Sequence, residues 1–338
     1  MRILVGMSGG LDSTYAALAL KEQGHEVEGA VALMHEYTET DDARRAAESI
    51  GIPLHIIDAR ERFENIGIAD FISEYSRART PNPCVICNSE VKFRVLLDYA
   101  LEHGFDKIAT GHYAEIVETD HGYAVRRCAD AKKDQTYMLW RLPQDVLSHL
   151  VFPLSSMAKE DIRVDARTRG LFVADKRDSQ EICFIPSGDH ASYIAEQGII
   201  APHGNFVDKN GKILGEHEGI TRYTVGQRKG LGISLGARAF ITRIDADTNC
   251  ITVDTEPASD THVELTSLVF SGISRGALSS NQRFTVKLRY QAKPVSCTVI
   301  MQENDVELLL DEPSFSVTPG QSAVVYDGDV IAFGGLIK

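Results

Sequence analysis

The first third of the chain alternates short apolar runs with amphipathic segments, and this alternation limits the fold more than any other feature. The apolar runs typical of strands cover residues 3–7, 27–34, 53–59 and 105–114. Segments with helical spacing separate them, at residues 12–24, 41–51 and 89–104. Strands that alternate with helices require right-handed crossovers, which give a parallel sheet with both faces covered. We therefore predict an α/β fold class for this part.

The remainder changes character near Ile194. Helical spacing predicts helices over residues 134–150 and 159–170. Beyond them, Asn210-Gly211 between two β-like runs predicts a hairpin, and short strands separated by turn residues follow from Val263 onward. We expect a catalytic domain at residues 1–194, a small central β-rich domain at 195–262 and a C-terminal β-barrel at 263–338.

Composition restricts the environment and the partners. The formal net charge of −13 argues against a general polyanion binder, although a local basic surface remains compatible with it. The N-terminus lacks the pattern of a signal peptide, and no apolar run reaches the roughly 18–20 residues of a membrane helix. We therefore expect a cytoplasmic protein without membrane contact, whose six cysteines are mostly reduced.

A glycine turn, SGGLDS, lies at residues 8–13 between the first expected strand and the first expected helix. Gly9 and Gly10 allow the backbone to approach an oxyanion, toward which the helix-start N–H groups point. Ser8 and Ser13 add hydroxyl donors, and Asp12 can cap the helix or help to hold Mg²⁺. An ordinary capped turn would use the same residues, but the strand–turn–helix context favours phosphate binding.

The segment TPNPCVICN, residues 80–88, contains Cys84 and Cys87 in a Cys-x-x-Cys pattern. Such a pair serves in zinc sites, redox pairs, iron–sulfur sites and thiol catalysis. A structural zinc ion would need a fourth ligand, and nothing in the spacing of His112 or His190 favours one.

The chain resembles a known family nearly from end to end. The SGGLDS turn is similar to the pyrophosphate loop of the ATP pyrophosphatases, or PP-loop enzymes. With the cysteine segment and five further motifs, it resembles the bacterial tRNA-specific 2-thiouridylases. Those motifs lie at residues 109–114, 133–140, 179–186, 226–234 and 318–328. The resemblance implies an adenine-nucleotide alpha-hydrolase-like catalytic domain, a central β-rich domain that contacts tRNA and a C-terminal β-barrel.

The resemblance also implies an activity. ATP would adenylate the C2 oxygen of the wobble uridine in the anticodon stem-loop, releasing pyrophosphate and then AMP. Sulfur from a cysteine persulfide would take its place and give 2-thiouridine. Cys87 matches the nucleophile and Cys183 the persulfide carrier, a redox-active pair whose thiolate chemistry suits the task. A cysteine desulfurase or a sulfur-relay protein would supply the sulfur.

Cys84 departs from one form of the family, in which aspartate often precedes the nucleophile by three residues. The proton transfer that the aspartate would assist must then be carried out by Cys84, by water or by another group. Alternatively, Cys84, Cys87 and Cys183 hold a [4Fe–4S] cluster with one open iron. Three cysteines fit either scheme, so both the persulfide and the cluster remain open.

The resemblance assigns two groups of binding residues. Those implied for ATP, with Ala32 contacting adenine through its backbone, are Gly6, Met7, Ser8, Gly9, Gly10, Leu11, Asp12, Ser13, Ala32 and Gly111. Those implied for tRNA are Lys133, Asp134, Gln135, Arg289 and Tyr290. His112, beside Gly111, is either part of the nucleotide site or a satisfied core histidine.

Residues 283–291, read as one strand, place basic and apolar side chains on opposite faces. The predicted cationic strip, suited to a phosphate backbone, consists of Arg283, Lys287 and Arg289 with Thr285 and Gln291. The apolar face would carry Phe284, Val286, Leu288 and Tyr290. A solvated charged face would show the same pattern.

Two other functions fit parts of the sequence. An amide-forming PP-loop synthetase would adenylate a small metabolite, but it would need neither the thiols nor the C-terminal β domain. A tRNA-binding protein with a degenerate loop would not need an intact SGGLDS turn.

Overall fold

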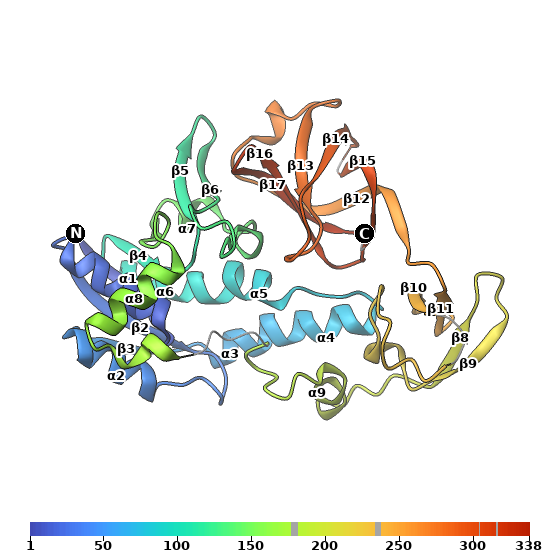
Figure 1. Ribbon diagram of the computed structural model, residues 1–338, viewed down its shortest axis with the longest axis horizontal. Coiled ribbons are helices and arrows are strands. Elements are labelled where there is room, and N and C mark those ends of the chain that lie inside the picture. The colour runs from blue at the N-terminus through green and yellow to red at the C-terminus, as the bar shows by residue number, and fades with distance from the viewer. Residues whose placement is uncertain (177–181, 234–237, 304, 316) are drawn as a thin grey trace.

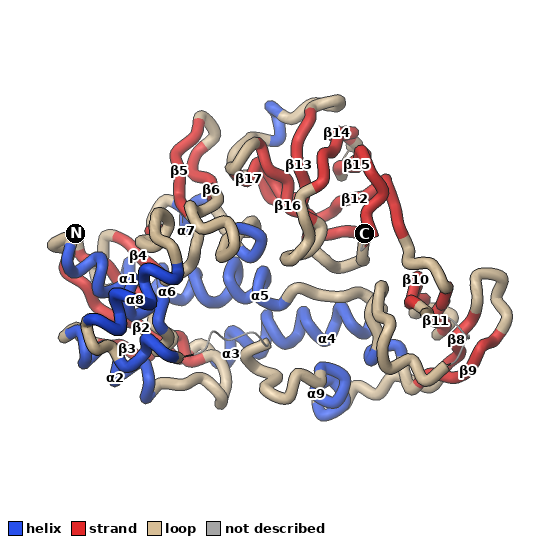
Figure 2. Tube along the Cα trace, in the orientation of Figure 1, coloured by secondary structure: helices blue, strands red, loops and turns tan. Residues whose placement is uncertain are grey.

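The computed structural model describes residues 1–176, 182–233, 238–303, 305–315 and 317–338. Over these residues the chain forms an α/β part, a small four-stranded sheet and a C-terminal barrel (Figure 1). Helices are concentrated in the first of these parts, while strands dominate the other two (Figure 2). The predicted fold class is therefore confirmed.

The α/β part is built on a parallel sheet with the strand order β3-β2-β1-β4-β7. Its strands are β1 (Arg2–Gly6), β2 (Glu26–Leu33), β3 (Leu54–Asp58), β4 (Lys107–Thr110) and β7 (Leu150–Val151). The helices around it are α1 (Leu11–Glu22), α2 (Asp41–Ile50), α6 (Phe93–Glu102) and α8 (Lys159–Thr168). Leu4 packs in one core cluster with α6, while Ile3 and Val5 pack with α1, α2 and α8. Burial on both faces explains why the centre of β1, residues 3–5, is uninterruptedly apolar.

A helical segment between β3 and β4 carries the cysteine motif, and its first half has no counterpart in the sequence prediction. It consists of α3 (Arg60–Arg62), the π-helix η1 (Phe63–Ile68), α4 (Ala69–Ser76), α5 (Pro83–Ile86) and the π-helix η2 (Cys87–Lys92). The loop between α4 and α5 reaches away from the parallel sheet, toward the barrel and the small sheet (Figure 1). Cys84 lies in α5, and Cys87 is the first residue of η2.

The predicted helix over residues 134–150 is wrong. The structure has only the 3₁₀-helix η3 (Thr136–Met138) and the short helix α7 (Gln144–Leu147) there. Pro143 interrupts the segment, and the fully buried Tyr137 and Trp140 pack in a core cluster that includes barrel residues. Tertiary contacts with the barrel therefore override the local helical spacing. The other short elements on either side are β5 (Glu115–Thr119), β6 (Gly122–Arg126), η4 (Phe172–Asp175) and α9 (His190–Glu196).

The small sheet has the order β10-β11-β8-β9. Its strands are β8 (Gly204–Val207), β9 (Ile213–His217), β10 (Phe240–Asp245) and β11 (Cys250–Asp254), and the 3₁₀-helix η5 covers Ile220–Arg222. The hairpin expected at Asn210-Gly211 joins β8 to β9, and Gly211 takes a φ of 82° there. Such a left-handed backbone favours glycine.

Six antiparallel strands form the C-terminal barrel, which closes through pairing of β12 with β17. They are β12 (Ser259–Phe270), β13 (Arg283–Lys287), β14 (Val295–Met301), β15 (Val306–Phe315), β16 (Ser322–Asp327) and β17 (Val330–Ile337), with the 3₁₀-helix η6 (Arg275–Ala277) between β12 and β13. The β5–β6 hairpin of the α/β part joins this sheet, since Arg126 of β6 pairs with Val330 of β17. One sheet therefore connects the two parts.

The strand predicted over residues 283–291 ends early, at Lys287. Phe284, Val286 and Leu288 are buried as expected, but Tyr290 is 37% exposed. Of the predicted cationic strip, Arg283 forms an ion pair with Asp311 on the neighbouring barrel surface. The continuous strip is therefore wrong, because the backbone turns after β13 and redirects the side chains that follow.

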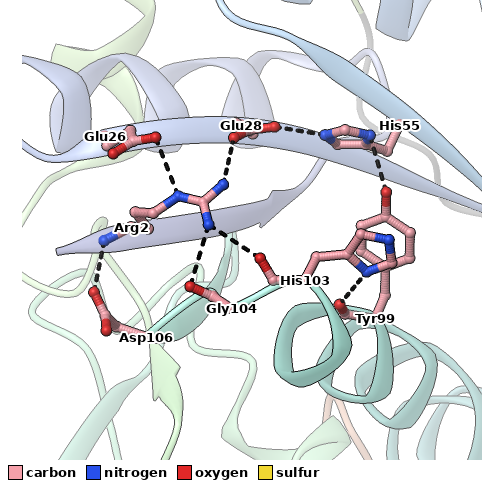
Figure 3. A network of polar contacts seen from close by, with 8 residues as sticks. All are labelled: Arg2, Glu26, Glu28, His55, Tyr99, His103, Gly104 and Asp106. Atoms are coloured by element: carbon pink, nitrogen blue, oxygen red, sulfur yellow. Dashed lines mark hydrogen bonds and ion pairs between the residues drawn. The ribbon is translucent and has the colours of Figure 1, made fainter.

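A network of ion pairs and hydrogen bonds connects the strands at the amino-terminal edge of the parallel sheet (Figure 3). Arg2 donates to Glu26 and Glu28 over 3.1 Å each, and to the carbonyl oxygens of His103 and Gly104. Glu28 also lies 2.6 Å from Nε2 of His55, whose Nδ1 is 3.0 Å from the Tyr99 hydroxyl. These contacts join β1, β2, β3 and the end of α6.

In the described part of the chain, none of the helices combines the length and the apolar character needed to cross a membrane.

Candidate active site

The glycine turn forms a tight bend between β1 and α1. Gly10 precedes the helix, and its carbonyl oxygen accepts hydrogen bonds from the hydroxyls of Ser13 and Thr14, at 3.2 and 2.8 Å. The Ser8 N–H donates to the Ser13 hydroxyl at 3.1 Å. Gly9 has a φ of 70°, and a Cβ there would lie 2.6 Å from the backbone nitrogen of Ala43. Glycine is therefore required where the start of α2 meets the bend.

Asp12, the acid of this turn, does not cap the helix, because the α1 N-cap has no side-chain hydrogen bond. Both of its carboxylate oxygens lie 2.6 Å from the ammonium of Lys159 at the start of α8, and Oδ1 also accepts from the Tyr113 hydroxyl at 2.8 Å. Lys159 is only 2% exposed. The carboxylate is thus neutralised within the protein and fixes α8 and the end of β4 against the bend.

The end of β4 meets the bend directly. A Cβ on Gly111 would lie 2.5 Å from the carbonyl carbon of Asp12, so only glycine permits this approach. His112 accepts or donates a hydrogen bond at 2.7 Å with the Thr110 hydroxyl and packs against Phe93 and Phe152. Burial, and then the charge of Lys92, hold the pKa of His112 well below its ordinary value. His112 is therefore a neutral, packed histidine at the edge of the site.

Cys87 lies at the carboxyl edge of the same sheet. Its side chain is 8% exposed, and its sulfur is 3.5 Å from the sulfur of Met34, which directly follows β2. Ala32 at the end of β2 packs against the same apolar cluster. Since β2 is the neighbour of β1, and Met7 in the bend donates to Ala30 of β2 at 2.8 Å, the thiol and the glycine bend share one edge. Open α/β sheets bind their ligands there.

The segment around Cys183 packs onto Cys87, although the two are distant in sequence. Phe184 and Ile185 belong to the apolar cluster of Cys87, and the Phe184 ring lies 5.3 Å from the rings of both Phe63 and Phe71. Cys183 itself is exposed at the surface beside this cluster. Residues 179–181 of its motif lie outside the described residues.

Electrostatic coupling between the thiols supports their proximity. Burial raises the pKa of Cys87 to about 12, and negative charge on Cys183 or Cys84 raises it as well. Cys84 and Cys183 are exposed, yet the surrounding protein limits their hydration enough to raise the pKa of each thiol. All three thiols are therefore predominantly protonated at neutral pH, although a nearby cation partly opposes the effect of burial.

Lys92 is such a cation, and the sequence analysis missed it. Its charge lowers the pKa of Cys84, Cys87 and Cys183. It ends the π-helix that Cys87 begins, and its ammonium donates to Oδ1 of Asn88 at 2.9 Å. Asn88 is held in turn by the Met138 carbonyl oxygen at 2.9 Å. Across the described residues, no carboxylate forms an ion pair with Lys92, so its charge remains directed to the thiols.

A metal cluster finds no support in this arrangement. Within the residues that the structure covers, no three or more His, Cys, Asp or Glu side chains form a group able to hold a metal ion. The [4Fe–4S] alternative on Cys84, Cys87 and Cys183 stays a prediction.

The residues expected to contact tRNA are brought together from two parts of the chain. The pKa of Tyr290, raised mainly by burial, also responds to the charges of Asp134, Lys133 and Cys84. The Tyr290 ring lies 6.1 Å from that of Tyr137. Barrel and α/β part thus meet beside Cys84.

Several of these side chains already have partners within the protein. Asp134 is buried and accepts from the Thr136 hydroxyl at 3.0 Å. Gln135 accepts from the Tyr113 N–H at 2.9 Å. Arg289 donates to the Val225 carbonyl oxygen at 3.0 Å and to the Thr318 hydroxyl at 2.5 Å. These contacts connect the expected RNA-binding residues to the glycine bend and to the small sheet.

Comparison with domain families agrees with this architecture. Residues 1–187 match the tRNA methyl transferase HUP domain, 192–255 the tRNA methyl transferase PRC-barrel domain and 262–337 the aminomethyltransferase beta-barrel domain. A solved 4-thiouridine synthetase–RNA complex with bound ATP aligns over 58% of this chain and 50% of that one. The two chains are 18% identical, with a TM-score of 0.37.

Curated relatives match over the whole length. The tRNA-specific 2-thiouridylase MnmA of Clostridium acetobutylicum is 42% identical over 353 residues, covering 100% of this chain and 99% of the relative. The enzyme of the same name from Acetivibrio thermocellus is 42% identical over 357 residues, with 100% and 99% covered. Identity of this extent includes all three parts of the fold. The chain belongs to the family of the tRNA-specific 2-thiouridylases.

Proposed function

We propose that this protein is a tRNA-uridine 2-sulfurtransferase, which uses ATP to convert the wobble uridine of tRNA to 2-thiouridine. The observation that supports this most strongly is the meeting of Cys87, the segment of Cys183 and the glycine bend at one edge of the sheet. An amide-forming synthetase would have no use for two thiols at its nucleotide loop. A cytoplasmic location follows from the tRNA substrate.

In the first step, ATP is bound by the bend and adenylates the C2 oxygen of uridine. The start of α1 would hold the phosphates, since backbone N–H groups and the helix dipole stabilise negative charge there. Gly6 through Ser13, Ala32 and Gly111 form the nucleotide site. Mg²⁺ would neutralise phosphate charge at this site, and Asp12 would be a weak ligand for it, because the carboxylate already binds the Lys159 ammonium. Pyrophosphate leaves, and the uridine oxygen becomes part of an AMP ester.

In the second step, the terminal sulfur of a Cys183 persulfide attacks C2. The C2–O bond breaks, and AMP leaves with the electron pair. The persulfide proton passes to water, since the raised pKa of Cys84 makes its thiolate scarce as a base. The uridine is then joined to Cys183 through a sulfur–sulfur bond.

In the third step, Cys87 loses its proton to water, and the resulting thiolate, which the charge of Lys92 favours, attacks the Cys183 sulfur. The sulfur–sulfur bond to the nucleoside breaks, and 2-thiouridine leaves with the electron pair. The resulting Cys87–Cys183 disulfide is reopened by a thiol reductant, which supplies two electrons and two protons. A cysteine desulfurase or a sulfur-relay protein then reloads Cys183. Lys133, Asp134, Gln135, Arg289 and Tyr290 form the RNA contact in this scheme.

Serine substitutions test the assignment. Cys87→Ser and Cys183→Ser should each abolish 2-thiouridine formation, while tRNA-dependent pyrophosphate release continues. The matched control is Cys250→Ser, which changes a partly buried cysteine in the small sheet and should leave both reactions unchanged. Thiolation at the wild-type rate by both serine variants would contradict the proposed chemistry. Pyrophosphate release that needs a small carboxylic acid instead of tRNA would favour an amide-forming synthetase.

A further inference from the structure

The loop that leads into the cysteine helix is held by the C-terminal barrel. The Gln321 side-chain amide donates to the carbonyl oxygens of Thr80 and Pro81, at 2.9 and 3.2 Å. The Thr80 N–H donates to the Pro319 carbonyl oxygen at 2.8 Å. Arg79 donates to the Ile337 carbonyl oxygen at 3.2 Å. The barrel thus binds three consecutive residues just before α5, which carries Cys84 and leads into Cys87.

Close packing reinforces these hydrogen bonds. Gly320 has a φ of 88°, and a Cβ there would lie 3.0 Å from both N and O of Thr80. The cavity left between Pro81, Val85, Gly320 and Leu336 measures only about 10 Å³. Close contacts of this kind transmit small displacements between neighbouring groups, since little free volume is left to absorb them.

The same barrel loop, Thr318–Gln321, also connects to the other parts of the molecule. The Thr318 hydroxyl accepts from Arg289, which binds the Val225 carbonyl oxygen of the segment before β10. Directly after the loop, the Ser322 carbonyl oxygen accepts from the Tyr137 hydroxyl at 2.9 Å. Segments from all three parts of the chain therefore meet at this loop.

We propose that Gln321 is a positioning residue for sulfur transfer: from the barrel, it fixes the loop Arg79–Pro81 and so sets the location of Cys87. This inference rests on the proposed function. Cys87 attacks a Cys183 sulfur that also carries the nucleoside, so the reacting sulfurs must be aligned. Misplacement of a reacting group by about 1 Å costs on the order of 100-fold in rate. Docking of the barrel, which carries expected RNA contacts, is thereby coupled to the competence of the thiol.

The test uses two variants of the full-length protein. Gln321→Glu keeps the size of the side chain but directs a carboxylate at two carbonyl oxygens, whereas Gln321→Ala only removes the two hydrogen bonds. We expect kcat for 2-thiouridine formation to fall roughly 10- to 100-fold in Gln321→Glu and less in Gln321→Ala. KM for tRNA and tRNA-dependent pyrophosphate release should stay within about twofold, because neither depends on the position of Cys87.

The control is Gln282→Glu, in the same barrel. Among the residues that the structure describes, the side chain of Gln282 bonds only within its own loop, accepting from the Ser279 N–H at 3.0 Å and donating to the Ala277 carbonyl oxygen at 3.4 Å. Its thiolation kcat should equal that of the wild type.

Three results would overturn the inference: an unchanged kcat in both Gln321 variants, a rise in KM alone, or a fall in melting temperature without a fall in kcat of the folded protein. If Gln321→Glu does not fold, Gln321→Ala alone decides by the same criteria. Failure of the proposed function is distinct, since the wild-type protein would then form no 2-thiouridine.

Discussion

The two edges of the parallel sheet differ in whether their charged side chains have partners of opposite charge. At the amino-terminal edge, Arg2 is surrounded by Glu26, Glu28 and backbone carbonyl oxygens, and each charge has a partner (Figure 3). At the carboxyl-terminal edge, Lys92 faces thiols without a carboxylate within the described residues, and Cys87 is buried among apolar side chains. The first arrangement lowers the free energy of the fold. The second leaves a cation without an acidic partner beside buried thiols, a costly arrangement of the kind that functional sites commonly contain.

Removal of Lys159 should have the largest effect on activity and stability, because it would break the ion pair that the carboxyl edge does contain, Asp12–Lys159. In Lys159→Met, the Asp12 carboxylate loses its ammonium partner beside the glycine bend. We expect tRNA-dependent pyrophosphate release to fall by about 100-fold, since negative charge would then oppose the ATP phosphates. The destabilisation should be about 1–3 kcal/mol, below the full cost of a buried unpaired charge because Asp12 is 31% exposed.

Pyrophosphate release and urea unfolding measure the two effects. The double variant Asp12→Asn/Lys159→Met is the control, and it should regain most of the stability because no charge is left unpaired. If Lys159→Met released pyrophosphate at the wild-type rate, the Asp12–Lys159 pair would have no part in nucleotide binding.

Removal of Lys92 should have an intermediate effect, which falls on the reactivity of Cys87. It tests what a cation without a carboxylate partner does at the carboxyl edge. Lys92 lowers the pKa of Cys87, so Lys92→Met should raise that pKa further. The thiolate forms only as the pH rises through the pKa, so the pH profile should move to higher pH. A pKa that is higher by about one lowers the thiolate fraction at neutral pH about tenfold. The rate of Cys87 alkylation by iodoacetamide as a function of pH measures this directly, in a protein whose exposed cysteines are replaced by serine.

Lys21→Met is the matched control, since the Lys21 ammonium binds the carbonyl oxygens of Ile50 and Gly51 away from the thiols. An identical pH profile for Lys92→Met and wild type would mean that another group stabilises the thiolate.

The smallest effect should follow a change at the amino edge, where stability but not activity depends on the charges. Burial raises the pKa of Glu28, but the hydrogen bonds and charges of His55 and Arg2 outweigh this effect and hold the pKa below its ordinary value. Glu28 therefore adds stability that is present above its unfolded pKa and is lost as the pH falls through its lower folded pKa. Glu28→Gln should cost about 1–2 kcal/mol at pH 7, with the difference shrinking below about pH 4.

Urea unfolding across this pH range gives the difference, and thiolation activity of the folded variant should remain at the wild-type level. Loss of thiolation activity would show that the two edges are not independent.

The sequence alone predicted the features that local chemistry determines. The bend at Gly9 and Gly10, the strand before it and the helix after it follow from residues adjacent in the chain. Asn210-Gly211 predicted its hairpin for the same reason. The prediction that Cys183 lies near Cys87 depends only on the family resemblance, since no local sequence pattern connects the two residues.

What the sequence did not reveal depends on contacts between distant segments. Lys159 reaches Asp12 from α8, and no spacing rule indicates such a pair. Lys92 follows Cys87 closely, but its orientation depends on Asn88 and a π-helix that propensity does not predict. Residues 134–150 have helical spacing, yet Tyr137 and Trp140 are used to pack against the barrel. The strand from Arg283 was extended too far because its alternation continues beyond the turn at Leu288.

The attachment of the β5–β6 hairpin to β17 has a consequence for dissecting the molecule. Val324, Tyr326 and Ile331 of the barrel lie in one core cluster with Val125 and Trp140, while other barrel residues fill its interior. A fragment cut near Val263 would expose this apolar outer surface of the barrel. It would also expose the strand edge at which β6 pairs with β17. Both features favour aggregation. The three parts of the chain are therefore not independent domains, and single substitutions will report on them more reliably than truncation.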